Sequence, residues 1–297
     1  MDIIQAMDIF ITAKRADGLA ERTIADYRRV FRRYVKHVDP DLDSWDRSTA
    51  RDYAAYINGL SWASATKGIH IRYLRSFWGW LYREGLTAED LSAAVAAPKP
   101  SIKDEPLITT SEFKRLVEAC DGDRWAVRDR AILLMLADTG MRRSEITSLS
   151  RSQVTFEDGG AWIMLPGETT KNGKERYVFL GQASAAALRA YLDARTDDRQ
   201  ALFISERGPL GGEGIAYMLK RRARIAGMDP ARIHPHLLRK IFATWWIENG
   251  GDEQRLMKIG GWSGPEMLRI YVRLGSREKL QDAHKQYGPV DNVLEES

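Results

Sequence analysis

Apolar residues recur three or four positions apart through most of the first hundred residues, which is the spacing of one helix face. One such series comprises Ile24, Tyr27, Phe31, Tyr34 and Val38. A second predicted helix starts after Ser64 and carries an aromatic stripe on its core side. That stripe comprises Tyr73, Phe77, Trp78 and Trp80. Residues 3–96 are therefore predicted to form a small bundle of about four or five helices.

Basic side chains lie beside these apolar stripes. From Arg28 to Lys36 no acidic residue interrupts them, whereas a solvated helix face normally carries both signs of charge. A solvated amphipathic surface would explain either helix alone, but the missing acidic residues favour contact with the phosphate backbone of DNA. The predicted DNA-binding residues are Arg28, Arg29, Arg32, Arg33 and Lys36 on the first helix and Lys67, Arg72 and Arg75 on the second.

The helical pattern stops at a segment with the composition of a linker. Residues 97–106, APKPSIKDEP, contain three prolines and mixed charge without apolar periodicity. We therefore expect a helical DNA-binding domain at 1–97, a linker at 98–106 and a second domain at 107–275. Residues 276–297 are expected to form a C-terminal helix and a polar tail, and that helix could pack on a neighbouring copy of the chain.

Beyond the linker, helical patterns alternate with a hairpin. They return at Thr110–Ala119 and Arg128–Ala137 and continue after the hairpin to Val272. Residues 161–180 show a strand–turn–strand pattern that contains Asn172-Gly173, a strong signal for a two-residue turn. The expected fold class is mainly α with a small β-sheet or hairpin, as an N-terminal helical bundle followed by an α+β domain.

Composition narrows the class of protein further. The 297 residues are 44% hydrophobic, enough for ordinary cores, and a net charge of +4 with a pI of about 9.1 is compatible with a nucleic-acid partner. The single cysteine, Cys120, excludes an intramolecular disulfide and a cysteine-rich zinc site, and its apolar neighbours predict a buried thiol. Neither a signal peptide nor a bilayer-spanning apolar run occurs, so a cytoplasmic protein without a membrane partner is expected.

The first candidate for chemistry is TGMRRSEI at residues 139–146. Thr-Gly ends an apolar helix, and Arg142 and Glu145 then lie three residues apart on one helix face. The carboxylate could fix the guanidinium while the outer edge of the guanidinium contacts a phosphate. An ordinary surface ion pair explains the same two residues equally well.

The second candidate is the tip of the hairpin, where Lys171 and Lys174 flank Asn172-Gly173. An ammonium group held there could donate a proton to a departing alkoxide. A hairpin made soluble by its charges is the simpler explanation of the lysines alone.

The third candidate is HPHLLR at residues 234–239. Pro235 suits the start of a helix, which places His236 and Arg239 one turn apart on one face. An imidazole and a guanidinium side by side near a helix N-terminus suit phosphate recognition. A lone histidine, by contrast, is more often structural than catalytic.

The fourth candidate is GGWS at residues 260–263, followed nine residues after its tryptophan by Tyr271. Trp262 offers an N–H donor that does not titrate. Tyr271 has apolar neighbours, among which a tyrosine usually belongs to the core. By themselves these two residues are a weak signal.

The order of these candidates is more specific than any one of them. Arginine, lysine, His-x-x-Arg, tryptophan and tyrosine follow one another, and this order resembles that of the tyrosine recombinases, or phage integrases. TGMRRSEITSL resembles the family's first arginine box, KNGKERYVFL its lysine hairpin, HPHLLRKIFATWW its His-x-x-Arg box and GGWSGPEMLRIYVRL its nucleophile box. The likeness covers roughly residues 3 to 275 and implies a SAM-like core-binding domain joined to a catalytic domain.

The resemblance implies a role for each matching residue. Arg142 and Arg239 would bind the phosphate, and Glu145 would support the first of them. Lys171 would be the hairpin acid and Tyr271 the nucleophile. The full implied set is Arg142, Lys171, His236, Arg239, Trp262 and Tyr271 as catalytic residues, with Glu145 in support.

Two positions depart from the family pattern. Trp262 stands where most bacterial members have histidine, although Cre-like members have tryptophan there. Because an indole N–H does not transfer a proton, proton transfer would depend on Lys171 and His236. Lys240 replaces a second histidine found in many relatives, and we expect little effect from that change.

The implied reaction breaks and remakes a phosphodiester without a metal or a cofactor. Tyr271 would attack phosphorus to give a 3′-phosphotyrosyl bond and a free 5′-hydroxyl, and a hydroxyl would then reverse the step. The sequence has neither an acidic cluster with metal-ligand spacing nor a P-loop. Exchange between two duplexes needs four active sites. The resemblance therefore implies a monomer in solution that forms a homotetramer on double-stranded DNA with a specific target site. This assembly would act in the nucleoid.

Three alternatives use overlapping features. A type IB topoisomerase would use nearly the same residues, as a monomer without a defined site. A non-catalytic DNA-binding regulator would have lost catalytic positions, and all of them are filled here. A metal-dependent nuclease is the least supported. Integration, excision, dimer resolution and transposon movement share this chemistry, so the residues leave the biological role and the target sequence open.

Overall fold

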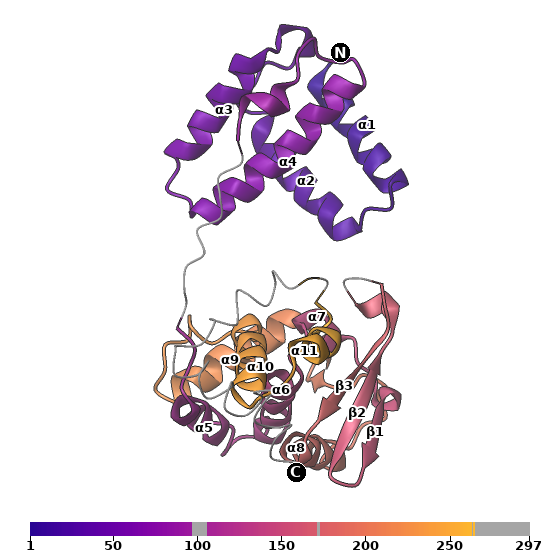
Figure 1. Cartoon of the computed structure of the whole chain (residues 1–297), viewed down its shortest axis with the longest axis vertical. Coiled ribbons are helices and arrows are strands. Elements are labelled where there is room, and N and C mark those ends of the chain that lie inside the picture. Colours follow the sequence, from indigo (N-terminus) through magenta and orange to yellow (C-terminus); the bar gives the residue numbers. More distant parts are fainter. Residues whose placement is uncertain (97–105, 171–172, 263, 265–297) are drawn as a thin grey trace, which may run out of the picture. The chain divides into compact units, whose positions relative to one another are not determined.

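The computed structural model describes residues 1–96, 106–170, 173–262 and 264. The chain divides into two compact units, Met1–Glu105 and Pro106–Ser297 (Figure 1). Most of the predicted linker and the predicted C-terminal helix and tail lie outside the described residues. Within the described ranges, no helix is both long enough and apolar enough to cross a membrane.

The first unit is a bundle of helices, as the apolar periodicity predicts. Its elements are α1 (Ile3–Ala16), α2 (Glu21–Tyr34), η1 (Leu42–Ser44), α3 (Arg47–Gly59), α4 (Ser64–Arg83) and η2 (Leu91–Ala94), where η marks a 3₁₀ turn. Aromatic rings fill its core: the centroid of Phe10 lies 5.0 Å from that of Tyr27 and 5.4 Å from that of Phe77. The buried Trp78 indole donates a hydrogen bond to Tyr34 Oη at 2.9 Å. Rings from three helices therefore interlock edge to face, a favoured aromatic geometry.

Helix α2 ends earlier than its apolar series suggests. The helix stops at Tyr34, so Lys36 and Val38 lie in the turn that follows and not on the helix. The prediction that Lys36 belongs to the helix was therefore wrong.

The second unit packs helices around α6. Its helices are α5 (Thr110–Glu118), α6 (Ala126–Thr139), α7 (Arg143–Thr147), α8 (Gln182–Asp193), α9 (Gly212–Ile225), α10 (Pro235–Glu248) and α11 (Glu253–Gly260). Helix α6 packs against α8 on one side and α10 on another, and most of its side chains are buried (Figure 1). Together with the small antiparallel sheets, this confirms the expected fold class.

A three-stranded antiparallel sheet lies beside α8 and α6. The unit's strands and 3₁₀ turns are η3 (Arg151–Gln153), β1 (Val154–Glu157), β2 (Gly160–Leu165), η4 (Gly167–Thr169), β3 (Arg176–Leu180), β4 (Ile204–Ser205) and β5 (Gly208–Pro209). On β3 the side chains of Arg176, Val178 and Leu180 are buried, while Tyr177 and Phe179 are exposed. Since side chains alternate between faces, Arg176 shares the inner face with two apolar residues.

The hairpin differs from its prediction in how its strands are joined. β2 and β3 pair as expected, from Ala161 with Leu180 to Leu165 with Arg176, but residues 166–175 connect them. The prediction of a two-residue turn at Asn172-Gly173 was therefore wrong. The connection first forms η4 and is closed by Thr170, whose hydroxyl donates to the carbonyl oxygen of Lys174 at 2.8 Å.

The two-residue turn lies instead one strand earlier. Asp158-Gly159 joins β1 to β2, since Glu157 pairs with Gly160. Gly159 has a φ of +85°, a conformation that glycine adopts without steric cost. Strand β1 itself was not predicted, although Asp-Gly is a strong hairpin signal.

Candidate active site

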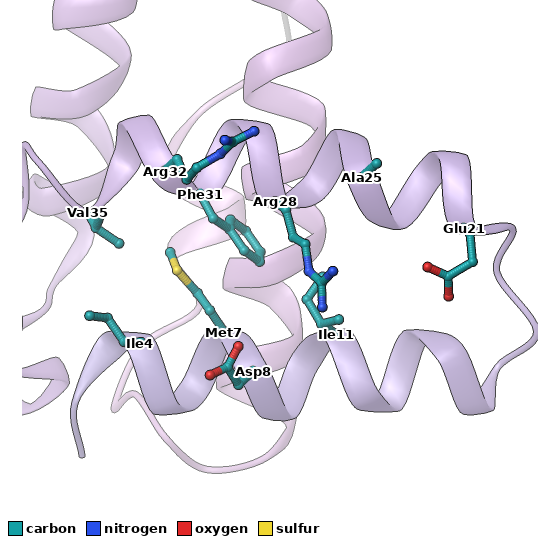
Figure 2. A pocket seen from close by; sticks show the side chains of 10 residues that line it. All are labelled: Ile4, Met7, Asp8, Ile11, Glu21, Ala25, Arg28, Phe31, Arg32 and Val35. Carbon is teal, nitrogen blue, oxygen red and sulfur yellow. The ribbon is translucent and has the colours of Figure 1, made fainter.

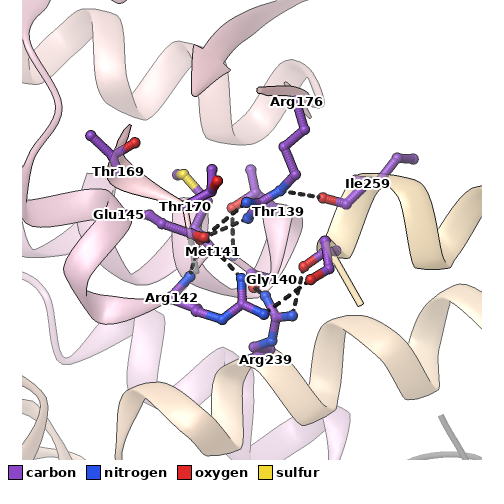
Figure 3. A network of polar contacts seen from close by, with 12 residues as sticks. Thr139, Gly140, Met141, Arg142, Glu145, Thr169, Thr170, Arg176, Arg239 and Ile259 are labelled. Atoms are coloured by element: carbon purple, nitrogen blue, oxygen red, sulfur yellow. Dashed lines mark hydrogen bonds and ion pairs between the residues drawn. The ribbon is translucent and has the colours of Figure 1, made fainter. Parts of the chain in front are cut away.

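The first arginine motif lies where α6 ends and α7 begins. Gly140, with a φ of +59°, ends α6 in the left-handed conformation. Arg142 is the residue before α7, and Glu145 lies in the first turn of that helix. Arg142 Nη1 donates to Glu145 Oε1 at 2.9 Å, and the backbone N–H of Arg142 donates to Glu145 Oε2 at 2.7 Å (Figure 3). The expected pairing of this arginine with this glutamate is therefore present.

Glu145 is fully buried and binds a second arginine. Arg176 of β3 donates to Oε1 at 2.8 Å and to Oε2 at 2.7 Å (Figure 3). Burial raises the pKa of Glu145, but the hydrogen bonds and charges of Arg176, and then of Arg142, outweigh it, so that the pKa lies below its ordinary value. The carboxylate is therefore ionised between two guanidinium groups.

Arg239 reaches the same place from α10. Its side chain is buried, and its Nη1 donates to the carbonyl oxygen of Gly140. Its Nη2 donates to the carbonyl oxygen of Gly260 at 2.6 Å. The guanidinium carbon also lies 4.1 Å from the ring centroid of Trp262, which is cation–π geometry. The second predicted phosphate ligand is thus close to the first motif and to the predicted indole.

The end of α11 joins these arginines. Three consecutive carbonyl oxygens each accept a hydrogen bond from a different arginine: Ile259 from Arg176 Nε at 2.9 Å, Gly260 from Arg239 Nη2 and Gly261 from Arg142 Nη2 at 3.0 Å. The last carbonyl groups of a helix have no partner within it and form the negative end of its dipole. They therefore suit a cluster of positive charges, which we call the arginine cluster (Arg142, Arg176 and Arg239).

Trp262 packs into a small apolar cluster. Its ring is 6% exposed and lies parallel to that of Phe242, with 6.4 Å between centroids. A left-handed Gly261, with a φ of +64°, ends α11 and turns the chain toward this position. The indole therefore packs against two residues of α10, Phe242 and Arg239.

His236 occupies the first turn of α10. Pro235 is the first residue of the helix, as predicted, and His234 caps it by accepting from the backbone N–H of Leu237 at its Nδ1, at 3.1 Å. His236 is exposed, and its ring lies parallel to that of His234 with 6.4 Å between centroids. It thus lies one turn before Arg239 on the same helix.

The comparisons with known proteins decide the family. Residues 106–278 match the model of the phage integrase family, and this match spans more than half of the chain. The chain belongs to the phage integrase family. Tyrosine recombinase XerD of Oceanobacillus iheyensis is 30% identical to it over 295 residues, which cover 95% of this chain and 97% of the relative. Tyrosine recombinase XerC of Lactobacillus delbrueckii subsp. bulgaricus is 32% identical over 256 residues, 82% of this chain and 84% of the relative.

Solved structures agree on the fold of this integrase family member. The Tn1549 transposon integrase in complex with transposon right end DNA has a TM-score of 0.77 at 16% identity and covers 97% of this chain and 100% of its own. A lambda integrase dimer bound to a core site has a TM-score of 0.73 at 17% identity, covering 90% and 97%. With relatives named tyrosine recombinases along nearly its whole length, the protein is a tyrosine site-specific DNA recombinase.

Two predicted catalytic residues of the recombinase, Lys171 and Tyr271, lie outside the described residues. Lys174, the other lysine of the hairpin tip, is exposed, and Lys240 is partly exposed on α10. The structure therefore brings together three of the predicted site residues with Glu145, namely Arg142, Arg239 and Trp262. A fourth, His236, lies one turn before Arg239 on α10.

Most of the predicted DNA-binding residues of the first unit are exposed, and two others bind the backbone of their own unit. Arg28 and Arg32 line a groove between α1 and α2 whose apolar lining includes Met7 and Phe31 (Figure 2). The other exposed members are Arg29, Arg33, Lys36 and Arg72. Arg29 pairs with Asp26 at 2.7 Å, and the guanidinium of Arg33 lies over the ring of Trp62. Lys67 and Arg75 instead donate to the backbone carbonyl oxygens of Asn58 and Ser92, at 2.7 and 3.0 Å. Each of these two side chains thus uses one donor within the unit.

Sequence reasoning missed Arg176. It follows a turn and a glutamate, in a stretch that resembles a solvated hairpin. The signal that could have found it is the alternation on β3, where Arg176 takes the same face as Val178 and Leu180. A charged residue at an inward position needs a partner, and here that partner is Glu145.

Proposed function

We propose that the recombinase cleaves and rejoins DNA through attack of Tyr271 on a phosphodiester held by Arg142 and Arg239, giving a 3′-phosphotyrosyl intermediate. The observation that carries this proposal is the convergence of the two arginines. Arg142 precedes α7 and Arg239 lies on α10, yet they donate to the adjacent carbonyl oxygens of Gly261 and Gly260, ten and eleven residues before Tyr271 in the sequence.

The arginines suit the charge that develops in this reaction. Attack on phosphorus increases the negative charge on the phosphoryl oxygens, and cations fixed in advance stabilise that charge without reorganising. Arg142 keeps 24% of its side chain exposed, and Glu145 and Gly261 engage only part of its five N–H groups. It can therefore approach a phosphate while its position is held from behind.

Proton transfer falls to residues other than Trp262. The indole can donate a hydrogen bond but does not titrate in this range. His236 is exposed at the start of α10, where an imidazole can meet a DNA phosphate or a leaving group. Lys171 would protonate the departing 5′-oxygen, which leaves as the free 5′-hydroxyl. Since the ordinary pKa of tyrosine is about 10, the positive site assists the ionisation of Tyr271.

The first unit would bind the target duplex through its exposed arginines. Arg28, Arg29, Arg32 and Arg33 on α2 and Arg72 on α4 are all exposed, and cations of this kind release counterions when they contact phosphates. Lys67 and Arg75 would support the helices that carry them, because their donors bind backbone carbonyl oxygens. A monomer in solution would assemble as a homotetramer on paired target sites in the nucleoid, with residues 276–297 contacting a neighbouring protomer.

Covalent capture of DNA tests this function. Wild-type protein should form a protein–DNA adduct in the presence of EDTA, and sequencing of genomic DNA recovered with it should return one target motif. The Tyr271→Phe variant should bind the same DNA without an adduct, because it lacks the nucleophilic oxygen. Loss of the wild-type adduct in EDTA would refute the metal-free mechanism, and an adduct with Tyr271→Phe would refute the assigned nucleophile.

The same preparation separates recombination from a topoisomerase activity. A recombinase should join two captured sites and leave supercoiled plasmids without the site unchanged. Relaxation of such plasmids by a monomer would favour the type IB topoisomerase alternative. Binding without an adduct under every condition would favour the non-catalytic regulator.

A further inference from the structure

Arg176 is a buried cation that the reaction described so far does not use. Its side chain is 8% exposed, and both of its terminal nitrogens bind the fully buried carboxylate of Glu145. Arg142 binds the same two oxygens through its Nη1 and its backbone N–H (Figure 3). One carboxylate is therefore shared by two guanidinium groups.

The charges of this group do not cancel. Glu145 carries one negative charge, and Arg142 and Arg176 carry one positive charge each, so the three side chains together are left with one positive charge. Without Arg176, Glu145 and Arg142 would form a neutral pair. A neutral pair attracts a phosphate far less than an uncompensated cation does at the same distance.

We propose that Arg176 is a positioning residue of the active site, which balances the charge of Glu145 so that Arg142 presents an uncompensated positive charge to the scissile phosphate. The inference rests on the proposed role of Arg142 as a phosphate ligand. Arg176 itself does not contact the substrate, because it lies behind Glu145 on the inner face of β3.

Two further features of Arg176 let it position the site as well as balance the charge of Glu145. Its Nε donates to the carbonyl oxygen of Ile259 at 2.9 Å, and a Cβ placed on Gly261 would come within 3.1 Å of its guanidinium. Glycine at 261 therefore allows the end of α11 to approach both Arg176 and Arg142. The same arginine thus connects β3, α7 and α11, the elements next to Lys171, Arg142 and Trp262 in the sequence.

A purely structural ion pair between β3 and α7 would show the same contacts. The two roles differ in how they depend on the charge of the substrate. A methylphosphonate at the scissile position lacks one of the negative oxygens of a phosphate, so it needs one positive charge fewer in the transition state. A structural role would affect cleavage of both substrates by the same factor.

The experiment compares Arg176→Met with wild type on duplexes that carry the captured target site. One duplex has a phosphate and the other a methylphosphonate at the scissile position, and adduct formation is followed in a single turnover at saturating protein. We expect Arg176→Met to slow adduct formation by about 100-fold on the phosphate, because neutralising Arg142 with Glu145 should cost about as much as losing one transition-state donor. On the methylphosphonate the expected loss is under about 10-fold, since less charge must be stabilised.

Arg195→Met provides the matched control. Arg195 is also a buried arginine of the second unit, bound through two nitrogens to one carboxylate, Asp197, and through Nη1 to backbone carbonyl oxygens. Its loss should change cleavage of the two substrates by equal factors. Equal factors for Arg176→Met as well would overturn the charge-balancing role.

A double variant keeps the test valid if Arg176→Met unfolds. Glu145→Gln combined with Arg176→Met removes both charges and leaves a polar side chain of equal size against Arg142. It should form adduct on the phosphate at least about 10-fold faster than Arg176→Met, since the carboxylate that neutralises Arg142 in the single variant is gone. If Arg176→Met does not fold, the double variant should still fold and discriminate between the two substrates as wild type does. A double variant no faster than the folded single variant, or one with a changed substrate ratio, contradicts the proposal.

A DNA-free measurement separates this inference from the proposed function. Titration with inorganic phosphate, followed by the NMR signal of the Arg142 Nε–H group, should give at least about threefold weaker binding in Arg176→Met than in wild type. If wild-type protein forms no adduct on any DNA, the proposed function fails while this titration still decides the role of Arg176. Equal phosphate affinities in the two proteins would refute that role.

Discussion

A second group of buried charges lies outside the active site and allows a quantitative test of the fold. Arg222 of α9 is fully buried and donates from Nε to Asp129 Oδ2 at 2.8 Å. Its terminal nitrogens donate to both carboxylate oxygens of Asp123, at 2.7 and 3.0 Å. Asp129 also accepts two hydrogen bonds from Arg128 at its Oδ1. We predict that Asp129→Asn strongly destabilises the second unit.

The magnitude follows from what the substitution leaves behind. Asp129 is 1% exposed and lies between two buried guanidinium groups, those of Arg128 and Arg222. Asparagine has the same size, but it lacks the charge and replaces one acceptor with a donor. Removing one partner from a buried ion pair costs about 3–5 kcal/mol, because the remaining charge cannot be solvated. That is a large share of the roughly 5–15 kcal/mol that typically stabilises a domain.

Hydrogen exchange measures this loss unit by unit. The slowest amides of α6 report global opening of the second unit, so the unfolding free energy that they give should fall by about 3–5 kcal/mol in Asp129→Asn. Glu213→Gln is the control, because Glu213 pairs with Arg143 at 3.4 Å while its side chain is 95% exposed. Such a surface pair contributes at most about 1 kcal/mol. A loss below about 1 kcal/mol in Asp129→Asn would show that the second unit does not depend on this ion group.

Three further predictions concern single residues. Gly140→Ala should destabilise the second unit by about 2–4 kcal/mol in the same exchange experiment. Alanine is strained at a φ of +59°, and its Cβ would lie within 2.9 Å of Phe242 Cγ. Wild-type stability of this variant would contradict that close packing. Hydrogen bonds from Arg222 lower the pKa of Asp123 from 3.8 to about 2, so the stability that this carboxylate gives is complete above pH 4 and is lost as the pH falls toward 2. Acid titration of the unfolding free energy should therefore be less steep in Asp123→Asn than in wild type. Burial raises the pKa of Cys120 to about 12, so a thiol reagent at pH 8 should modify it only after denaturation, and rapid labelling of the native protein would show that it is accessible.

The sequence predicts best what is local. Ile24, Tyr27 and Phe31 mark the buried face of α2 because helical spacing places them on one side, whatever they pack against. The sequence also paired Arg142 with Glu145 correctly, but not on one helix face: Arg142 is the extended N-cap residue of α7, and a capping residue meets the third residue of its helix. The buried thiol of Cys120 likewise follows from its apolar neighbours.

What the sequence hides depends on contacts between distant segments. Arg239 and Gly140 are 99 positions apart, and no periodicity relates them. Both Asp158-Gly159 and Asn172-Gly173 are turn dipeptides, and only the pairing of Glu157 with Gly160 shows which one joins two strands directly. A local pattern specifies the element, while the register and the partner come from tertiary packing.

The three carbonyl groups at the end of α11 make the arginine cluster cooperative. Arg142, Arg176 and Arg239 are anchored to successive residues of one short segment, from Ile259 to Gly261. A shift of that segment by one residue would take an acceptor from all three guanidinium groups at once. The segment also continues toward Tyr271 in the sequence. A change at this end of α11 would therefore reach the whole arginine cluster together with the start of the segment that leads to the proposed nucleophile.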